Sequence, residues 1–307
     1  MISPDRVCEL FCGAGGMALG FSSRFDIVQA VDINEFAVHT YQANHPDTQV
    51  RRQDIRNLSG CRGDFEGITG VIGGPPCQQW SRRNIRKTGD DIRVELPGEF
   101  LRLVEEIKPR FFVLENVPFA PKEKKQNVID AGRLAGYDVV SLHLNAADFG
   151  AAQTRRRWIV IGLKGKRWTR PAPRSPGTVR SAFSGISENW GGMQSTPETL
   201  QHLTNARTRE WCSMTGSGGY KNMIHLEWDR PAPAVVNLKK VYMVHPDENR
   251  NISLAEAAAL QGFPTDYIWK GTESSIAQMI ANAMPAELAG AIAGSIMNGG
   301  TIQESIL

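Results

Sequence analysis

The sequence predicts an α/β protein in which a parallel sheet is covered by helices on both faces. Three observations lead to this fold class. Apolar strand-like runs alternate with helical stretches over roughly the first half of the chain, and a glycine-rich segment follows the first run directly. The chain is also large enough for a substantial core, with 307 residues of which 41% are hydrophobic and 22% charged. This composition excludes a disordered or collagen-like chain.

Strands and helices are expected to alternate along this first part of the chain. The apolar runs with the length and composition of strands are 7–11, 27–32, 70–72, 111–115, 138–144 and 158–163. The helical connectors are 17–22, 35–44, 98–107 and 126–135. Because a helix links most strands to the next, the pattern is typical of parallel strands joined by crossover helices.

The composition changes after about Lys166, where prolines and glycines interrupt every periodic element. We therefore expect a large domain over residues 1–180, a smaller irregular domain over 181–252, and a C-terminal segment over 253–307 that returns to the large domain. Ser253 and Glu256 have the spacing of a capping box at a helix start. Residues 282–296 predict a final helix with Pro285 in its first turn.

The net charge of +3 is small, but its distribution is uneven. Nine basic residues and no acidic one lie between positions 151 and 184. Such a run can attract a polyanion, or it can be a solvated basic face. No stretch approaches the roughly 18 uninterrupted apolar residues of a membrane helix, and the N-terminus has no signal-peptide core, so we expect a cytosolic protein.

The five cysteines include no CxxC pair, which argues against a disulfide framework or a zinc site. We expect reduced thiols and no metal. Cys8, Cys12, Cys61 and Cys212 are expected to be small buried hydrophobes. Cys77 differs, because loop-forming and polar residues surround it.

The segment ELFCGAGGMALG, at positions 9–20, is the first motif that indicates chemistry. Glycines between a strand and a helix allow a tight turn and let the backbone approach a ligand. Asp32 ends the next apolar run, where a carboxylate can accept ribose hydroxyls, so an adenosine-containing cofactor is expected. Gly13, Gly15 and Ala18 also satisfy the G-x-G-x-x-A pattern, so an NAD enzyme and a purely structural turn both remain open.

The second motif, GGPPCQQWS at positions 73–81, follows an apolar strand. Pro75 and Pro76 fix the backbone before Cys77, which aims the thiol outward from a strand end, where open α/β sheets bind ligands. Cys77 is therefore a candidate nucleophile.

Two further motifs place charged groups at strand ends. Residues 111–117, FFVLENV, end an apolar strand with Glu115, where desolvation can keep the acid protonated so that it donates a hydrogen bond. Residues 153–157, QTRRR, lead into another strand, and alternation puts Arg155 and Arg157 on the same side, as a clamp for a phosphate or a carbonyl. Either motif alone could be an ordinary surface feature, and the conjunction with Cys77 gives them weight.

These four motifs, in this order, closely resemble the C5-cytosine-specific DNA methyltransferases of bacterial restriction–modification systems. Further agreement comes from Asp54-Ile55, Asp91-x-Arg93, Arg230-Pro231, LQGFP at 260–264, and Asn282. Two departures are visible: Ala281 stands where the family usually has glycine, and Asp32 stands where glutamate is more frequent.

The resemblance implies a Rossmann-like, S-adenosyl-L-methionine-dependent methyltransferase with a small target-recognition domain over 181–252. Cys77 would attack C6 of a flipped cytosine, Glu115 would bind N3 and the exocyclic amine, Arg157 the base carbonyl, and Arg155 would hold the site or a phosphate. The implied cofactor contacts are Phe11, Gly13, Gly15, Gly16, Asp32, Ile33, Asp54, Ile55, Pro76 and Asn282. The implied DNA contacts are Ser81, Arg82, Arg83, Arg86, Arg93, Arg207, Arg209 and Lys221.

The resemblance also implies a monomer that binds double-stranded DNA in the bacterial or archaeal cytosol, at the nucleoid, with a restriction endonuclease acting separately. Three alternatives remain open at this point. An RNA methyltransferase of the tRNA-modifying branch shares the motifs, although its usual Cys-Phe-Thr signature is not found. An NAD dehydrogenase would leave Cys77, Glu115 and Arg157 unexplained, and a non-catalytic DNA-binding regulator would not need them.

Overall fold

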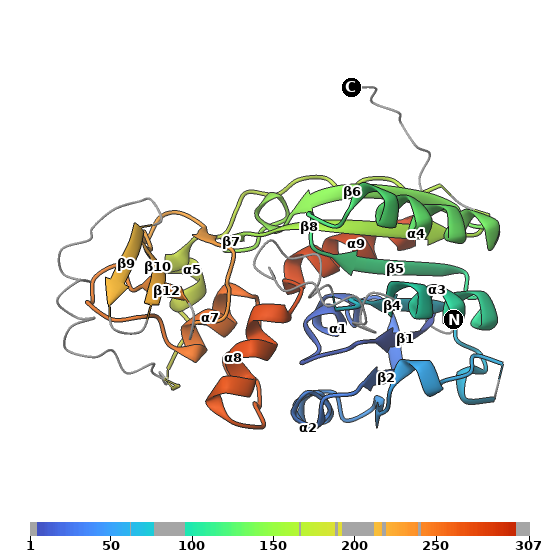
Figure 1. The fold of residues 1–307 in the computed structure, drawn as a ribbon, viewed down its shortest axis with the longest axis horizontal. Coiled ribbons are helices and arrows are strands. Elements are labelled where there is room, and N and C mark those ends of the chain that lie inside the picture. Colours follow the sequence, from blue (N-terminus) through green and yellow to red (C-terminus); the bar gives the residue numbers. More distant parts are fainter. Residues whose placement is uncertain are drawn as a thin grey trace.

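The fold is built on one large sheet (Figure 1). The computed structural model describes residues 5–61, 63–76, 96–165, 167–187, 190–191, 212–216, 219–238 and 241–298, without the side chains of residues 64 and 212–222. The sheet has seven strands in the order β3-β2-β1-β4-β5-β8-β6. These strands are β1 Arg6–Leu10, β2 Asp26–Asp32, β3 Gln49–Arg52, β4 Gly70–Gly73, β5 Phe111–Asn116, β6 Asp138–Asn145 and β8 Arg156–Leu163.

The predicted α/β class is confirmed, and the prediction of an all-parallel sheet is wrong for one strand. The neighbours from β3 to β5 pair in parallel, whereas β8 runs antiparallel to both β5 and β6. The chain returns from β6 to β8 through a short 3₁₀ turn, Ala146–Asp148, and the two-residue strand β7 Gln153–Thr154, with no crossover helix. A connection that short permits only an antiparallel return. The strand β3 was not among the six expected strands, because its four residues, QVRR, carry a single apolar side chain.

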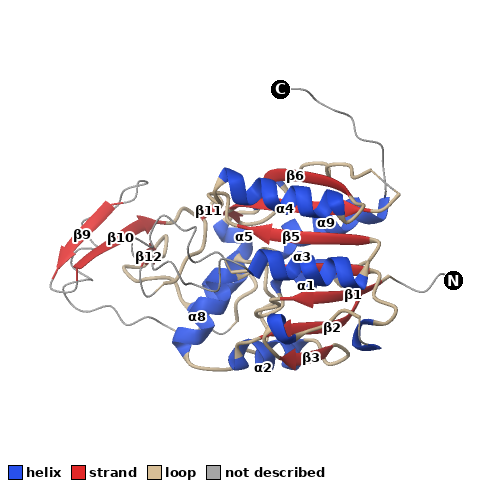
Figure 2. Ribbon diagram, turned by 45° about the vertical axis from the view of Figure 1, so that its right-hand side comes forward, coloured by secondary structure: helices blue, strands red, loops and turns tan. Residues whose placement is uncertain are grey.

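Helices cover both faces of the sheet, as a doubly wound fold requires (Figure 2). Alternate strand residues face opposite sides: Val113 packs with α1 Gly16–Phe21 and α9 Ala286–Asn298, while Leu114 packs with α3 Leu96–Ile107 and α4 Lys122–Leu134. The helix α2 Glu35–Asn44 adds Tyr41 to the first of these two cores.

A three-stranded sheet lies beyond α7 Leu254–Leu260 and α8 Glu273–Asn282, away from the large sheet (Figure 1). Its strands are β9 Cys212–Gly216, β10 Gly219–His225 and β12 Val241–Val244. The short helix α5 Val179–Phe183 packs beside it, and β11 Ala232–Pro233 pairs with β7. One apolar core joins the side chains of α5, α7 and α8 with Ile224 of β10, so the small sheet is tied to the returning segment.

The C-terminal helices confirm one expectation and correct another. Ser253 and Glu256 form the predicted capping box at the start of α7. The final helix does not begin at Asn282, which is instead the last residue of α8. Ala283 is extended, at φ −59° and ψ 145°, and Pro285 two residues later begins the approach to α9, where its fixed φ suits a helix start.

The span Glu273–Asn298 is long and apolar enough to cross a membrane by length and composition alone, yet 56% of its most apolar window is buried in this structure. It consists of two separate helices, and α9 packs along α1 in the core on one face of the large sheet. Its apolar residues therefore serve internal packing.

The cysteine expectation holds in part. Cys8 and Cys12 are free and buried, whereas Cys61 is free and exposed, so its assignment to the core is wrong. Cys61 lies between the 3₁₀ helices Ile55–Asn57 and Gly63–Phe65, outside the strands of the sheet. The side chain of Cys212 lies outside the described residues.

Candidate active site

The strand order places the site at the centre of the sheet. From β1 the chain continues outward to β2 and β3, whereas from β4 it continues to β5 on the other side. Ligands of open α/β sheets bind outside the carboxyl ends of the strands at such a reversal. The residues that follow β1 and β4 are Phe11–Gly16 and Gly74–Pro76, so the tertiary structure brings the first two sequence motifs together.

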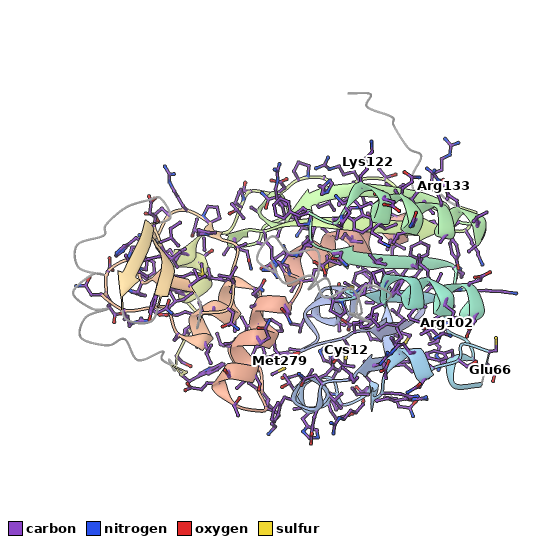
Figure 3. All side chains as sticks on the ribbon, in the orientation of Figure 1. Cys12, Glu66, Arg102, Lys122, Arg133 and Met279 are labelled. Atoms are coloured by element: carbon purple, nitrogen blue, oxygen red, sulfur yellow. The ribbon has the colours of Figure 1, made fainter. Side chains whose placement is uncertain are left out.

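A cavity of about 790 Å³ opens at this point. Of the ten predicted cofactor residues, nine line it: Phe11, Gly13, Gly16, Asp32, Ile33, Asp54, Ile55, Pro76 and Asn282. Glu115, Arg155 and Arg157 line the same cavity. Cys12 and Met279, which also belong to the lining, are labelled in Figure 3.

The turn after β1 has an unusual backbone. Gly13 and Gly15 have φ angles of 53° and 86°, and the turn begins with Phe11 at φ 55°, a left-handed conformation that costs a non-glycine residue about 1 kcal/mol or more. A β-carbon on Gly13 would meet nothing within 4 Å. Gly15 does not line the cavity, and a β-carbon there would come within 2.7 Å of His45 Nε2.

Asp32 fastens this turn to the second strand. Its Oδ2 accepts from the backbone N–H of Gly13 at 2.9 Å and its Oδ1 accepts from that of Asn34 at 2.8 Å. Burial raises the pKa of Asp32, and these N–H groups oppose that shift. A carboxylate has about four lone-pair positions, so acceptor capacity remains for a ligand's hydroxyl groups.

Glu115 and Arg157 form an ion pair at the neighbouring strand ends. Arg157 Nε lies 2.7 Å from Glu115 Oε1. In the β5–β8 register Glu115 faces Ile159, so Arg157 is its diagonal neighbour on the same face. Glu115 Oε2 lies beside Gly74, where a β-carbon would come within 2.9 Å of it. The predicted protonated state of Glu115 stays a prediction.

Asn116 holds the loop that leads toward Cys77. Its Nδ2 donates to the carbonyl of Pro75 at 3.1 Å, and the Asn116 side chain is buried. The end of β5 therefore fixes the backbone two residues before Cys77. Cys77 itself lies outside the described residues, as do Ser81, Arg82, Arg83, Arg86, Arg93, Arg207, Arg209 and the side chain of Lys221.

Arg155 is buried and donates hydrogen bonds to backbone carbonyls. Its guanidinium donates to the carbonyl of Val235 at 2.7 Å and to that of Ala281 at 2.6 Å. Gln153, two residues earlier, accepts from Val235 N at 3.1 Å and donates to Gln261 Oε1 at 2.7 Å. The first half of the QTRRR motif thus joins the segment after β11 to α7 and α8.

The basic run does not form one face. Arg155 and Arg157 turn inward, and Arg180 pairs with Asp229 at 2.8 Å. The exposed members that the structure describes include Arg156, Lys164 and Arg167. A strand separates side chains onto two sides, which a count of charges along the sequence does not take into account.

Sequence reasoning missed two parts of the lining. Glu9 is buried, accepts from Tyr41 Oη at 2.9 Å, and its burial raises its pKa to about 8. The helix α8 contributes Ser275, Gln278 and Met279 in addition to Asn282. Ser275, Gln278 and Met279 precede Asn282 at helical spacings, which could have predicted that they share its face. The prediction was missed because the final helix was expected to start at Asn282.

The fold and this site define an α/β enzyme with one cavity that can take both a nucleotide-type cofactor and a second reactant. The chain belongs to the C-5 cytosine-specific DNA methylase family, whose model matches residues 6–181 and 181–298. It is a DNA (cytosine-5-)-methyltransferase, the activity classified as EC 2.1.1.37. The NAD dehydrogenase interpretation of the glycine motif is thereby wrong.

Individual relatives agree with the family assignment. The chain is 34% identical to the type II methyltransferase M1.HphI of Haemophilus parahaemolyticus, over 94% of this chain and 86% of the relative. It is 29% identical to M.NgoPII of Neisseria gonorrhoeae, over 96% of each. A crystal structure of a prophage-encoded putative DNA modification methyltransferase from E. coli superposes with a TM-score of 0.76 at 27% identity, over 96% of this chain and 99% of that one. DNMT2 of Spodoptera frugiperda, at 16% identity and a TM-score of 0.73 over 95% and 99%, shares the fold. The predicted Rossmann-like methyltransferase fold is confirmed.

Proposed function

We propose that this enzyme transfers a methyl group from S-adenosyl-L-methionine to C5 of a flipped cytosine in a specific sequence of double-stranded DNA, through a covalent bond from Cys77 to C6. One observation carries the proposal. The Glu115–Arg157 pair, the turn after β1 and the loop that leads to Cys77 border one cavity. A methyl donor and a base would therefore meet in the same cavity.

The lining fits the cofactor. S-adenosyl-L-methionine carries a sulfonium and an ammonium group, and Asp32 and Asp54 place two carboxyl groups around the cavity. The open side of Gly13 leaves room for close approach by a ligand, and Asp32 retains acceptor positions for ribose hydroxyls. Ile33, which is 63% exposed, offers an apolar surface for the adenine. When bound, the cofactor supplies a methyl group on positively charged sulfur.

Cys77 would activate the ring. Its thiolate would add to C6, which places an electron pair at C5; that pair would take the methyl group, with S-adenosyl-L-homocysteine as the leaving group. A base, for which water suffices, would then remove the C5 proton, and the electrons of that C–H bond would expel the Cys77 sulfur and restore the aromatic ring. Glu115 would bind N3 and the exocyclic amine, and Arg157 the neighbouring carbonyl. The bound base would thus replace the direct contact between these two side chains.

We assign DNA recognition to the small domain over 181–252 and to the loop after Cys77. Base flipping costs about a few kcal/mol, and the arginines of that loop would stabilise the flipped state. The names of the relatives support a role in restriction–modification, with a separate endonuclease as the functional partner. We expect a monomeric protein of the bacterial or archaeal cytosol.

Bisulfite sequencing of a plasmid from cells that express the protein tests the activity and identifies the sequence. A duplex with 5-fluorocytosine at that position should then form an adduct that resists denaturation, because the fluorine cannot leave as a proton does. Cys77→Ala should form no adduct, whereas Cys61→Ala, at an exposed free thiol, should form it normally. An adduct with Cys77→Ala would refute the nucleophile. If the plasmid stayed unmethylated and the protein transferred labelled methyl groups to tRNA, the DNA function would be wrong and the tRNA-modifying function would take its place.

A further inference from the structure

Two other amide side chains orient the amide of Asn282 at the cavity. Asn282 is the last residue of α8, is exposed, and lines the cavity. Gln278, one turn earlier on the same helix, donates from Nε2 to Asn282 Oδ1 at 2.7 Å. Asn237, which lies between β11 and β12, donates from Nδ2 to Gln278 Oε1 at 2.8 Å.

A carboxamide has one accepting end and one donating end, so a chain of amides has a direction. Asn237 donates to Gln278, and Gln278 donates to Asn282. One acceptor position of the Asn282 carbonyl is therefore occupied, and this chain of amides leaves the N–H donors of Asn282 to other partners. Without Gln278, rotation about the terminal bond would allow Asn282 to present either its oxygen or its nitrogen.

The backbone on both sides of this chain of amides is fixed by buried contacts. Arg155 donates to the carbonyl of Val235, which lies two residues before Asn237. It also donates to the carbonyl of Ala281, which directly precedes Asn282. Gln261 Nε2 donates to the carbonyls of Ile280 and Ala283. The backbone is thus held near both Asn237 and Asn282. What remains to be set is which end of each amide side chain, the oxygen or the nitrogen, faces its neighbour.

We propose that Gln278, itself oriented by Asn237, is a positioning residue that turns the N–H groups of Asn282 toward a hydrogen-bond acceptor of the cofactor, the carboxylate of its amino-acid part. This rests on the proposed function, which places S-adenosyl-L-methionine in the cavity. Gln278 acts through Asn282 and makes no contact with the reacting atoms.

Calorimetric titration with S-adenosylhomocysteine measures the effect without catalysis. Gln278→Met removes both hydrogen bonds with little change in volume, and the Kd should rise about fivefold, which is about 1 kcal/mol. Gln278→Glu should raise it further, because the introduced carboxylate would attract the N–H groups of Asn282 away from the ligand. The Kd of 5′-methylthioadenosine, which lacks the amino-acid part, should not change in either variant.

A double-mutant cycle shows whether Gln278 acts through Asn282. In the Asn282→Ala background, Gln278→Met should have no additional effect. The matched control is Gln126→Met on α4, which removes a hydrogen bond of the same i to i+4 spacing, from Gln126 Nε2 to Asp130 at 2.8 Å, and should leave the Kd unchanged.

The outcomes separate the two proposals. If the wild-type protein bound neither compound, the cofactor assignment would fail. If Asn282→Ala bound S-adenosylhomocysteine as the wild type does, the Asn282 contact and the positioning role would both be overturned. If Asn282→Ala weakened binding and Gln278→Met did not, or if Gln278→Met weakened both compounds equally, the positioning role alone would be overturned.

Discussion

The carboxylate of Glu115 lies against the α-carbon of Gly74, so closely that a β-carbon there would stand 2.9 Å from Oε2. Gly74 follows β4 and Glu115 lies near the end of the adjacent strand β5, so the two residues are distant in sequence. The contact explains why a glycine precedes the two prolines, since a larger residue would displace the acid proposed to face the base.

Gly74→Ala should therefore lower kcat about 10- to 100-fold, since a misplacement of about 1 Å at a reacting group has effects of that size. Cofactor affinity should change little, because Glu115 is assigned to the base. Steady-state kinetics with duplex DNA measure the effect. Gly98→Ala in α3 is the control, since a β-carbon there meets nothing within 4 Å. Equal kcat values for the two variants would contradict the role of this contact.

Asp32→Asn should both weaken cofactor binding and lower stability. An amide has one accepting end, so it cannot accept from the N–H groups of both Gly13 and Asn34 as the two carboxylate oxygens do, and an unsatisfied N–H costs about 1–3 kcal/mol. The cofactor KM should rise more than the DNA KM. Asp26→Asn, at an exposed position at the start of β2, is the control. A change in DNA affinity alone would show that the ribose assignment is wrong.

Glu9 should make stability fall as the pH rises. Burial raises its pKa from 4.5 to about 8, so between these values the folded state holds a proton that the unfolded state has released. The unfolding free energy should decline across this interval, by about 5 kcal/mol at most. Urea denaturation at several pH values measures the slope. Glu9→Gln, which does not titrate, should flatten it, whereas the exposed Glu66→Gln should not. Parallel profiles for the wild type and Glu9→Gln would contradict this origin.

The contact between α1 and α9 depends on one glycine of a facing pair. A β-carbon on Gly20 would come within 2.4 Å of both Ala289 Cβ and the backbone nitrogen of Gly290, whereas one on Gly290 would find its nearest neighbour at 3.5 Å. Gly20→Ala should cost about 1–3 kcal/mol or more through overpacking. Gly290→Ala should be neutral or stabilising, because alanine favours helix by about 1 kcal/mol. Thermal unfolding compares the two, and equal melting temperatures would show that the helices separate at little cost.

The sequence by itself determined the class of fold and the family, because each depends on short contiguous segments. The turn after β1, the strand that ends in Glu115 and the QTRRR motif each occur within a few residues, and local physics gives each a shape. The antiparallel direction of β8 could not be read from the segments, because it depends on how the chain returns after β6.

Tertiary structure alone decided what those side chains touch. It paired Glu115 with Arg157, turned Arg155 toward the carbonyls of Val235 and Ala281, and brought Asn237 to Gln278. These partners lie 42, 80, 126 and 41 residues apart, so no local pattern encodes them. Buried or flanking polar groups take the partners that packing delivers, and packing is a property of the whole chain.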